Sequence, residues 1–352
     1  MIKNIQIVNT NSIRDAMALL EKNIEKCLIV VDKKNRFYST LTDGDIRRAI
    51  LKGSHLETTL KVFVKKKKSL TISEKIYKNS SLKEIKKIID KFPQKKINLI
   101  PILDNKRKVV DYIENINAKS SNEKLKKIPL IIMAGGKGLR LRPFTNIFPK
   151  PLIPVNNIPA AEHIINKFLG DGIKKIYISV NFKKDLIKSY FKDKAYHLNF
   201  IEEKKEMGTI GSLSYLKNKV KSDFIVSNCD TIVKIDTNNL YEYHKKSNSL
   251  LTIVVATKNF QMPYGSCLLD NRGKLKKIDE KPNFDYLVNT GLYIMKPELL
   301  SLINKSQKLD FDQLIKKLKL KKKKIGIFPI SEKNWTDVGE WSDYNKLVLN
   351  KN

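Results

Sequence analysis

The sequence predicts an α/β protein in which a Rossmann-like, mostly parallel mixed sheet over residues 128–352 follows a smaller α/β domain over residues 1–117. Two observations predict this class. In the larger part, short apolar stretches alternate with amphipathic helical stretches, which is typical of a parallel sheet covered by helices on both faces. The first 117 residues instead repeat one helix-and-hairpin unit. The polar stretch 118–127 is predicted to be a linker, and 352 residues suffice for two hydrophobic cores.

The N-terminal repeat appears as two stretches of the form apolar, polar, apolar that begin 72 residues apart, Cys27–Tyr38 and Leu99–Val110. Each is predicted to be a β-hairpin with an Asx-type turn. Each follows a stretch with apolar residues at helical spacing behind a serine that can cap a helix, Ser12–Lys22 and Ser81–Lys91. The sequence therefore predicts a paired module.

The net charge of +33 raises the question of a nucleic-acid partner, because a basic surface attracts polyanions. Nearly all of this charge is lysine, with only eight arginines in the chain. The lysine runs Lys65–Lys68 and Lys321–Lys324 lack the arginines and aromatic residues that read bases and stack on them. We therefore expect no nucleic-acid partner.

The rest of the composition excludes further classes. No apolar run approaches the roughly 18 to 20 residues of a membrane helix, and Met1–Thr10 lacks the pattern of a signal peptide. The three cysteines and four histidines are scattered, which argues against a disulfide scaffold and against a structural zinc site. We expect a cytoplasmic protein without a membrane partner.

A hydroxyl and a carboxylate begin a predicted helix after the first hairpin, in the segment Leu41–Ile50. Thr42 and Asp45 are sufficient to cap that helix. The segment also resembles the T-x-x-D segment of a CBS repeat, in which the aspartate holds the ribose of an adenine nucleotide. The resemblance implies a tandem CBS module with a possible adenine nucleotide at Thr42 and Asp45. The second repeat has Glu114 and Asn117 at the corresponding positions, which departs from the pattern.

The larger domain is predicted from its alternating stretches, each bounded by turn residues. The predicted strands are Leu130–Ala134, Ile173–Val180, Phe224–Ser227 and Leu250–Ala256, and the predicted helices are Ala160–Leu169, Lys183–Phe191 and Leu240–Lys246.

The first strand of this domain leads directly into a loop of glycines and basic residues, Gly135–Pro143. Open α/β sheets bind ligands at the carboxyl ends of their strands. Glycines let backbone N–H groups approach phosphate oxygens, and arginine supplies planar donors to the same charge. The loop matches neither the dinucleotide fingerprint nor the Walker loop. It is predicted to bind phosphate in another way.

The segment Gly135–Leu141, followed by Phe148–Val155 with its Pro-Lys-Pro core, resembles the signature of the sugar nucleotidylyltransferase family, G-G-x-G-x-R-L then P-K-P. The resemblance extends over residues 129–352 and implies a GT-A-like fold. It also implies that the glycines and Arg140 contact a nucleoside triphosphate, and that Lys150 contacts the α-phosphate or the sugar phosphate. The glycines are Gly135, Gly136 and Gly138.

Two further segments follow the family order. Glu203–Gly211 resembles the E-x-x-x-L-G-T-A-G segment that contacts the nucleobase, which implies nucleotide binding by Glu203, Gly208 and Thr209. Asp230 ends a predicted apolar strand and matches the metal position of an N-x-D motif. Taken alone, an aspartate at a strand end is commonly a turn former.

The last segments resemble the family's sugar pocket and second carboxylate. The resemblance implies sugar or sugar-phosphate contacts for Gly265, Glu280, Lys281 and Asn289. Trp335–Gly339 resembles the W-x-D-x-G segment, which implies that Asp337 joins Asp230, 107 residues earlier, as a ligand of Mg²⁺. Magnesium prefers hard oxygen ligands from one or two carboxylates together with phosphates.

These residue types suit a reaction in which a sugar 1-phosphate oxygen attacks the α-phosphorus of a nucleoside triphosphate and pyrophosphate leaves. The catalytic candidates are Arg140, Lys150, Asp230 and Asp337.

The substrates are expected from resemblance alone. The Gly-Thr-x-Gly segment and the tail Trp335–Tyr344 are most similar to guanylyltransferases, and next to cytidylyltransferases. A CBS pair joined to this domain resembles bacterial glucosamine-1-phosphate guanylyltransferases of legionaminic acid synthesis. GTP and glucosamine 1-phosphate are therefore expected. Mannose- or heptose-1-phosphate guanylyltransfer, cytidylyltransfer and a non-catalytic CBS nucleotide sensor stay open. CBS pairs in the family often self-associate, so a homo-oligomer is expected.

Overall fold

The computed structural model describes residues 4–23, 26–64, 70–79, 84–85, 88–89, 99–114, 122–305, 307–341 and 344. The chain divides into two compact units, residues 1–120 and 121–352. Within the described ranges, no helix combines the length and the apolar composition needed to cross a bilayer.

The first half of the N-terminal unit is a sheet of order β1-β2-β3, made of Gln6–Val8, Cys27–Val31 and Phe37–Thr42. Helix α1 (Ile13–Lys22) begins at Ser12, whose hydroxyl accepts a hydrogen bond from the Asp15 amide in a capping box. Helices α2 (Asp43–Leu51) and α3 (Leu60–Phe63) follow the sheet. The predicted hairpin over Cys27–Tyr38 is therefore β2–β3.

The second half repeats this arrangement with a sheet of order β4-β5-β6, made of Ile72–Ser73, Leu99–Leu103 and Val109–Glu114, and with helix α4 (Glu74–Asn79). Both hairpins have the predicted Asx turn. Asp32 Oδ1 accepts from the amides of Lys34 and Arg36, and Asp104 Oδ1 accepts from those of Lys106 and Lys108. Most of the predicted helix Ser81–Lys91, the run Lys65–Lys68 and Asn117 lie outside the described residues.

The linker predicted over 118–127 is too long. Residues 118–121 lie outside the described part, but Asn122–Lys127 form a 3-10 helix, η3. Leu125 of η3 is fully buried in the core of the C-terminal unit. A polar stretch with a single leucine gives little periodic signal, so this anchoring residue was not predicted.

The C-terminal unit contains a seven-stranded sheet of order β11-β10-β7-β12-β17-β14-β18. Only β17 runs antiparallel to its neighbours, so the predicted mostly parallel mixed sheet is confirmed. In this order the strands are Leu198–Glu202, Ile176–Val180, Leu130–Ala134, Phe224–Asn228, Asn283–Met295, Leu251–Gln261 and Ile325–Ser331.

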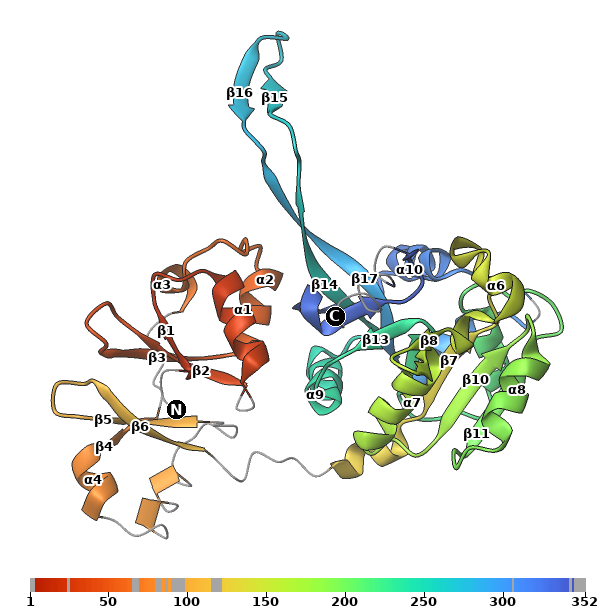
Figure 1. The fold of residues 1–352 in the computed structure, drawn as a ribbon, viewed down its shortest axis with the longest axis horizontal. Helices are drawn as coiled ribbons and strands as arrows, with labels where there is room; N and C mark the ends of the chain where they lie inside the picture. The colour runs from red at the N-terminus through yellow and green to blue at the C-terminus, as the bar shows by residue number, and fades with distance from the viewer. Residues whose placement is uncertain are drawn as a thin grey trace. The chain divides into compact units, whose positions relative to one another are not determined.

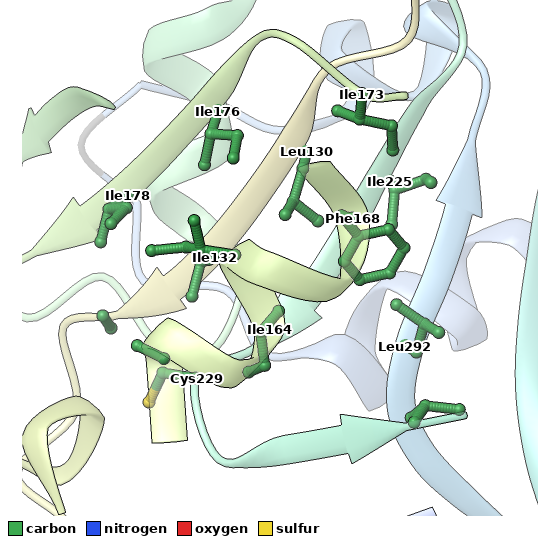
Figure 2. Packing of buried hydrophobic residues seen from close by; sticks show 14 of the residues in the cluster. Leu130, Ile132, Ile164, Phe168, Ile173, Ile176, Ile178, Ile225, Cys229 and Leu292 are labelled. Carbon is green, nitrogen blue, oxygen red and sulfur yellow. The ribbon is translucent and has the colours of Figure 1, made fainter. Parts of the chain in front are cut away.

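Helices cover both faces of this sheet because successive strand residues point to opposite sides. Leu130 and Ile132 of β7 pack with Ile164 and Phe168 of α7 in one core cluster (Figure 2), and Ile131 belongs to the cluster on the other face. The first cluster also includes residues of α8 and α9, and the second includes residues of α10. These helices are Ala160–Gly170 (α7), Lys184–Lys192 (α8), Thr237–Ser247 (α9) and Phe311–Leu320 (α10).

Short elements connect the sheet to the residues of the predicted site. They are η4 (Leu139–Leu141), α6 (Phe144–Ile147), η5 (Lys150–Leu152), β8 (Pro154–Val155), β9 (Ile158–Pro159), η6 (Gly211–Leu216), β13 (Thr231–Val233), η7 (Pro297–Leu302), η8 (Glu332–Asn334) and β19 (Trp335–Asp337).

Strands β14 and β17 continue beyond the sheet as a two-stranded ribbon, which extends away from the rest of the C-terminal unit (Figure 1). The pairing with β18 ends at Thr257, whereas β14 stays paired with β17 as far as Gln261 opposite Asn283. The hairpin β15 (Ser266–Leu269) and β16 (Leu275–Asp279) forms the far end. We call residues 258–287 the arm.

Candidate active site

The glycine loop lies where the sequence predicted, at the carboxyl end of the inner strand β7. Gly138 has a φ of +65°, a conformation that favours glycine. A Cβ there would lie 2.8 Å from Thr145 Cγ2 and 3.2 Å from Lys150 Cβ. The Thr145 hydroxyl donates a hydrogen bond of 2.9 Å to the Gly138 carbonyl. The glycine therefore lets the loop pack directly against the segment that contains Lys150.

Lys150 meets Asp230 beside this loop. Asp230 follows β12, which pairs in parallel with β7, so the two carboxyl strand ends are neighbours. The ammonium of Lys150 forms an ion pair with the Asp230 carboxylate, and their side chains are 15% and 6% exposed. The structure therefore brings together a cation and a carboxylate that the sequence analysis assigned separately.

Asp337 reaches the same place through a strand pair. β13 and β19 run antiparallel with Thr231 opposite Asp337, and the Val338 amide donates a hydrogen bond of 2.9 Å to the Asp230 carbonyl. A Cβ at Gly339 would collide with Asp230 Oδ2 and would lie 2.8 Å from Lys150 Nζ and 2.9 Å from Asp337 Oδ1. All three charged groups therefore converge on one point, which only glycine leaves open.

The two carboxylates outnumber the one buried cation. Burial by itself would lower the pKa of Lys150, but the Asp230 carboxylate outweighs burial and raises it. Burial, and after it the charge of Asp230, raises the pKa of Asp337. Lys150 is thus held in its charged form, and an excess of negative charge remains next to it.

This donor set fits a magnesium ion. The Asp230 carboxylate disfavours ionisation of Asp337, and a second cation would relieve this effect. Mg²⁺ is commonly bound by one or two carboxylates plus substrate phosphates. Among the residues that the structure describes, no group of three or more His, Cys, Asp or Glu forms a closed metal cage. Any metal at Asp230 and Asp337 would therefore need further oxygen ligands from substrate or water.

Arg140 lies in η4, directly after the glycines of the loop, and forms an ion pair with Glu340. Its side chain is 62% exposed, and that of Glu340 is 44% exposed. This pair links the glycine loop to the segment after Asp337, across 200 residues. At Gly136 a Cβ would meet no atom within 4 Å, so open space lies on that side of the loop.

Glu203 is buried and lies against the glycine loop at Gly135. Its carboxylate accepts hydrogen bonds from the Ser179 hydroxyl at 2.5 Å and from the Met207 amide at 3.4 Å. A Cβ at Gly135 would lie 2.7 Å from Glu203 Oε1. Glu203 thereby contacts the loop, whereas its predicted contact with a nucleobase stays a prediction.

The segment after Glu203 packs onto helix α10. Gly208 has a φ of +75°, and a Cβ there would lie 2.7 Å from the Leu309 carbonyl oxygen. The Thr209 amide donates to Asp310 Oδ1 at 2.9 Å, and the Thr209 hydroxyl accepts from the Phe311 amide at 2.9 Å. In this structure Thr209 therefore fastens the start of α10, and nucleotide binding by Gly208 and Thr209 stays a prediction.

The predicted sugar-binding residues are separated. Asn289 lies in the part of β17 opposite Val255 and donates to the Tyr293 hydroxyl at 2.9 Å. Gly265, Glu280 and Lys281 lie on the arm, where a Cβ at Gly265 would lie 2.8 Å from Glu280 Oε2. Glu280 and Lys281 precede β17, and the extended strand from Asn283 to Asn289 alone spans about 20 Å. The structure does not bring these four residues together in one copy of the chain.

In the N-terminal unit, Thr42 and Asp45 form a capping box at the start of α2. The Thr42 hydroxyl donates to Asp45 Oδ2 at 2.9 Å, and Asp45 also pairs with Arg48. The capping role that the sequence allowed is therefore present. Nucleotide binding at these two residues stays a prediction.

Four residues of the site were not found from the sequence. Gly339 makes room for the charged groups, Glu340 pairs with Arg140, Ser179 orients Glu203, and Thr145 holds the Gly138 carbonyl. Gly339 closes the W-x-D-x-G segment, but that resemblance did not indicate that it makes room for the charged groups. Glu340, Ser179 and Thr145 act through contacts that no local pattern marked. The fold and site define an α/β protein whose carboxyl strand ends bring together a glycine loop, a buried lysine and two carboxylates.

The chain belongs to the nucleotidyl transferase family, whose model matches residues 130–351. Residues 1–52 match the CBS domain. The bifunctional protein GlmU of Methanocaldococcus jannaschii is 32% identical over 63% of this chain and 54% of its own length. Mannose-1-phosphate guanyltransferase 2 of Candida glabrata is 32% identical over 61% of this chain and 62% of its own.

The match to D-glycero-alpha-D-manno-heptose 1-phosphate guanylyltransferase of Campylobacter jejuni is 28% identical and covers 62% of this chain and 98% of the relative. The match thus spans between about half and two thirds of several relatives, and nearly all of this one. The crystal structure of HddC from Yersinia pseudotuberculosis complexed with GMP-PN has a TM-score of 0.50 at 24% identity, over 64% of this chain and 100% of that chain. This likeness shows the fold.

Proposed function

We propose that this protein transfers a nucleoside monophosphate from a nucleoside triphosphate to a sugar 1-phosphate, forming a nucleoside diphosphate sugar. The sugar phosphate oxygen bonds to the α-phosphorus, the bond from that phosphorus to the bridging oxygen breaks, and pyrophosphate leaves. The observation that supports this proposal is the convergence of Lys150, Asp230 and Asp337 beside the loop Gly135–Gly138. Phosphoryl-group transfer needs positioning and charge stabilisation rather than a covalent nucleophile.

Each residue has a role that its position permits. Lys150 is nearly buried and keeps its positive charge, so it neutralises a phosphate that binds beside Asp230. Arg140, exposed at the loop, exchanges its contact with Glu340 for triphosphate oxygens. Backbone amides of the glycine loop approach the same phosphates. Asp230 orients Lys150 through their ion pair.

We further propose Mg²⁺ as the cofactor, held by Asp230 and Asp337. When bound, the ion would neutralise charge on the phosphates and the leaving pyrophosphate. The excess of carboxylate over ammonium at Gly339 supports this assignment.

For the substrates we propose GTP and glucosamine 1-phosphate, as in legionaminic acid synthesis. The names of the C. glabrata and C. jejuni relatives are consistent with guanylyl transfer. The uridylyltransferase relative from Synechocystis leaves the base open, so cytidylyl transfer and mannose or heptose 1-phosphate remain alternatives. Base choice depends on a few hydrogen bonds at the nucleobase.

The test is pyrophosphate release with Mg²⁺, crossing GTP, CTP, UTP, dTTP and ATP with glucosamine-, glucose-, mannose- and heptose-1-phosphate. Turnover with one pair identifies both substrates. No release with any pair would contradict the proposed activity, and would favour the CBS nucleotide sensor if adenine nucleotides bind.

The N-terminal unit is proposed to regulate the enzyme through an adenine nucleotide at Thr42 and Asp45. Its match to the CBS domain supports this proposal. A regulator must bind the active and inactive states with different affinities. Calorimetric titration of the full chain with AMP and ATP, repeated with Asp45→Ala, tests the site independently of turnover. Equal binding by both proteins would refute it.

A further inference from the structure

The segment that joins Arg140 to Lys150 has little support of its own. Of residues 142–149, only Thr145 and Pro149 are buried. Helix α6 within this segment is a single turn of four residues. One helical turn is unfavourable in isolation, because its first hydrogen bond does not offset the entropy lost in forming it. Contacts from elsewhere in the fold must therefore hold this segment in place.

Lys183 holds the end of α6. Its ammonium donates hydrogen bonds of 2.5 Å and 2.7 Å to the carbonyls of Asn146 and Ile147, the last two residues of that helix. The last carbonyls of a helix lack partners within the helix, and a lysine side chain can supply the missing donors. The adjacent Lys184 instead pairs with the Glu202 carboxylate at 2.8 Å. Of these two lysines, Lys183 is therefore the one committed to α6.

The backbone of Lys183 has a conformation that needs compensating contacts. Its φ of +51° and ψ of +36° are left-handed, which is strained for a residue with a long side chain. Glycine would adopt the same conformation without strain. Strain of this kind persists only where the surrounding contacts impose it, and it is frequent at functional sites. The two hydrogen bonds to α6 are contacts that can impose it.

The two residues before Lys183 reach other parts of the site. The Asn181 side-chain amide donates to the Glu203 carbonyl at 2.9 Å, and the Phe182 backbone amide donates to the Gly135 carbonyl at 3.5 Å. All three residues follow β10, whose carboxyl end lies beside that of β7. One short turn therefore contacts the segment of Glu203, the glycine loop and the end of α6.

A stiff connection passes the position of α6 on to Lys150. Lys150 comes three residues after Ile147, with Pro149 and Pro151 on either side of it. A proline fixes its own φ and restricts the residue before it. Few backbone rotations can therefore absorb a shift of Ile147 before it displaces the Lys150 side chain.

We propose that Lys183 is a positioning residue, whose ammonium fixes the end of α6 and thereby the backbone that presents Lys150 to a phosphate. This inference rests on the proposed nucleotidyl transfer. Because a misplacement of about 1 Å can lower a rate by about 100-fold, loss of the ammonium lowers kcat by about 10-fold. The Michaelis constant for the triphosphate changes by less than about 3-fold, since Arg140 and the glycine amides still bind it.

Steady-state pyrophosphate release by three variants of Lys183 tests the role. Lys183→Met removes the ammonium and keeps a long side chain. Lys183→Gly removes the ammonium and the left-handed strain together, so it unfolds at a higher temperature than Lys183→Met. Both variants lose about 10-fold in kcat despite this difference in stability. Lys183→Arg keeps a cationic donor and retains at least about half of the wild-type kcat.

Lys184→Met is the matched control because it makes the same change one residue further along the chain. It removes only the partly exposed ion pair with Glu202, and such pairs contribute little. Its kcat equals that of the wild type.

Hydrogen exchange of the Phe148 amide provides a readout that does not need turnover. This amide donates to the Phe144 carbonyl at 3.0 Å and closes the single turn of α6. Release of the helix end makes it exchange at least about 10-fold faster in Lys183→Met and Lys183→Gly. Its exchange in Lys184→Met stays at the wild-type rate.

Three results would overturn the inference. They are wild-type exchange of the Phe148 amide in Lys183→Met, a kcat of that variant within about two-fold of the wild type, and an equal loss of kcat in Lys184→Met. A wild type that releases no pyrophosphate with any substrate pair would overturn the proposed function and this positioning role with it. The behaviour of the wild type therefore tells the two failures apart.

Discussion

The ammonium of Lys150 and the carboxylate of Asp230 form a nearly buried ion pair at the adjoining ends of β7 and β12. The lysine comes from a short 3-10 segment, and the aspartate follows a strand 80 residues later. Since removing one partner of a buried pair leaves an uncompensated charge, the pair constrains both side chains. The pair also holds a cation next to the glycine loop, where we propose that a phosphate binds.

Replacing Lys150 by Ala is expected to lower turnover by at least ~100-fold, since a charged transition-state contact is lost. The control is Lys316→Ala, whose side chain is 77% exposed on α10 and pairs with Asp312 at 3.7 Å. Steady-state pyrophosphate release by both variants checks the prediction. Near-normal turnover of Lys150→Ala would exclude the proposed role.

Replacing Gly339 by Ala is expected to lower turnover by about 100-fold through displacement of Lys150, Asp230 and Asp337. Gly170→Ala is the matched control because a Cβ there meets no atom within 4 Å and Gly170 ends helix α7. That control keeps full turnover and gains up to about 1 kcal/mol of stability. Equal activity of the two variants would show that the space at Gly339 is not needed.

The first two glycines of the loop are expected to respond differently to alanine. In Gly135→Ala the Cβ meets the buried Glu203 carboxylate, so the unfolding temperature falls. In Gly136→Ala the Cβ enters open space, so stability is kept while triphosphate affinity falls, because the backbone can no longer approach phosphate closely. Thermal unfolding and nucleotide titration of both variants separate the effects. A loss of stability in Gly136→Ala would contradict the assignment.

The buried imidazole of His244 is expected to make stability depend on pH. Burial lowers the pKa of His244 from 6.5 to about 4, and its Nδ1 lies 2.7 Å from the Thr252 hydroxyl. The unfolded chain therefore binds a proton that the folded chain does not, between about pH 6.5 and pH 4. Above pH 6.5 His244 is neutral in both states and does not lower the free energy of unfolding. As the pH falls from 6.5 towards 4, the free energy of unfolding decreases by up to about 3 kcal/mol.

Denaturant unfolding of the wild type across this pH range measures that loss. His244→Gln removes the titrating group and flattens the dependence, whereas His197→Gln, at an exposed position, retains it. An equally steep dependence in His244→Gln would assign the effect to other groups.

Binding of Mn²⁺ as a spectroscopic substitute for Mg²⁺ tests the metal assignment without turnover. Electron paramagnetic resonance in the presence of nucleoside triphosphate is expected to show bound Mn²⁺ in the wild type. Asp337→Asn removes one of the two carboxylate ligands and weakens binding by at least ~10-fold. Asp312→Asn is the control, since Asp312 is exposed on α10 and pairs with Lys316. Unchanged binding in Asp337→Asn would exclude Asp337 as a ligand.

Much of the fold was predictable because its signals are local. The strand Leu130–Ala134 was predicted with its observed bounds, and the Asx turns at Asp32 and Asp104 follow from one side chain that accepts from amides two and four residues ahead. The buried anchor Leu125, inside a stretch that looked like a linker, was missed because a single leucine has no period.

The sequence by itself determined the alternation of strands and helices, the place of the glycine loop at a strand end, and the identity of the charged residues available to it. Those properties depend on neighbours within a few residues. Only the tertiary structure decided that Asp337 lies beside Asp230, that Glu340 pairs with Arg140, and that the arm separates Glu280 from Asn289. These relationships depend on which strands pair and where pairing ends. The first two join residues more than 100 positions apart, and the third depends on β17 staying paired with β14 beyond the end of β18, so none of them has a local signal.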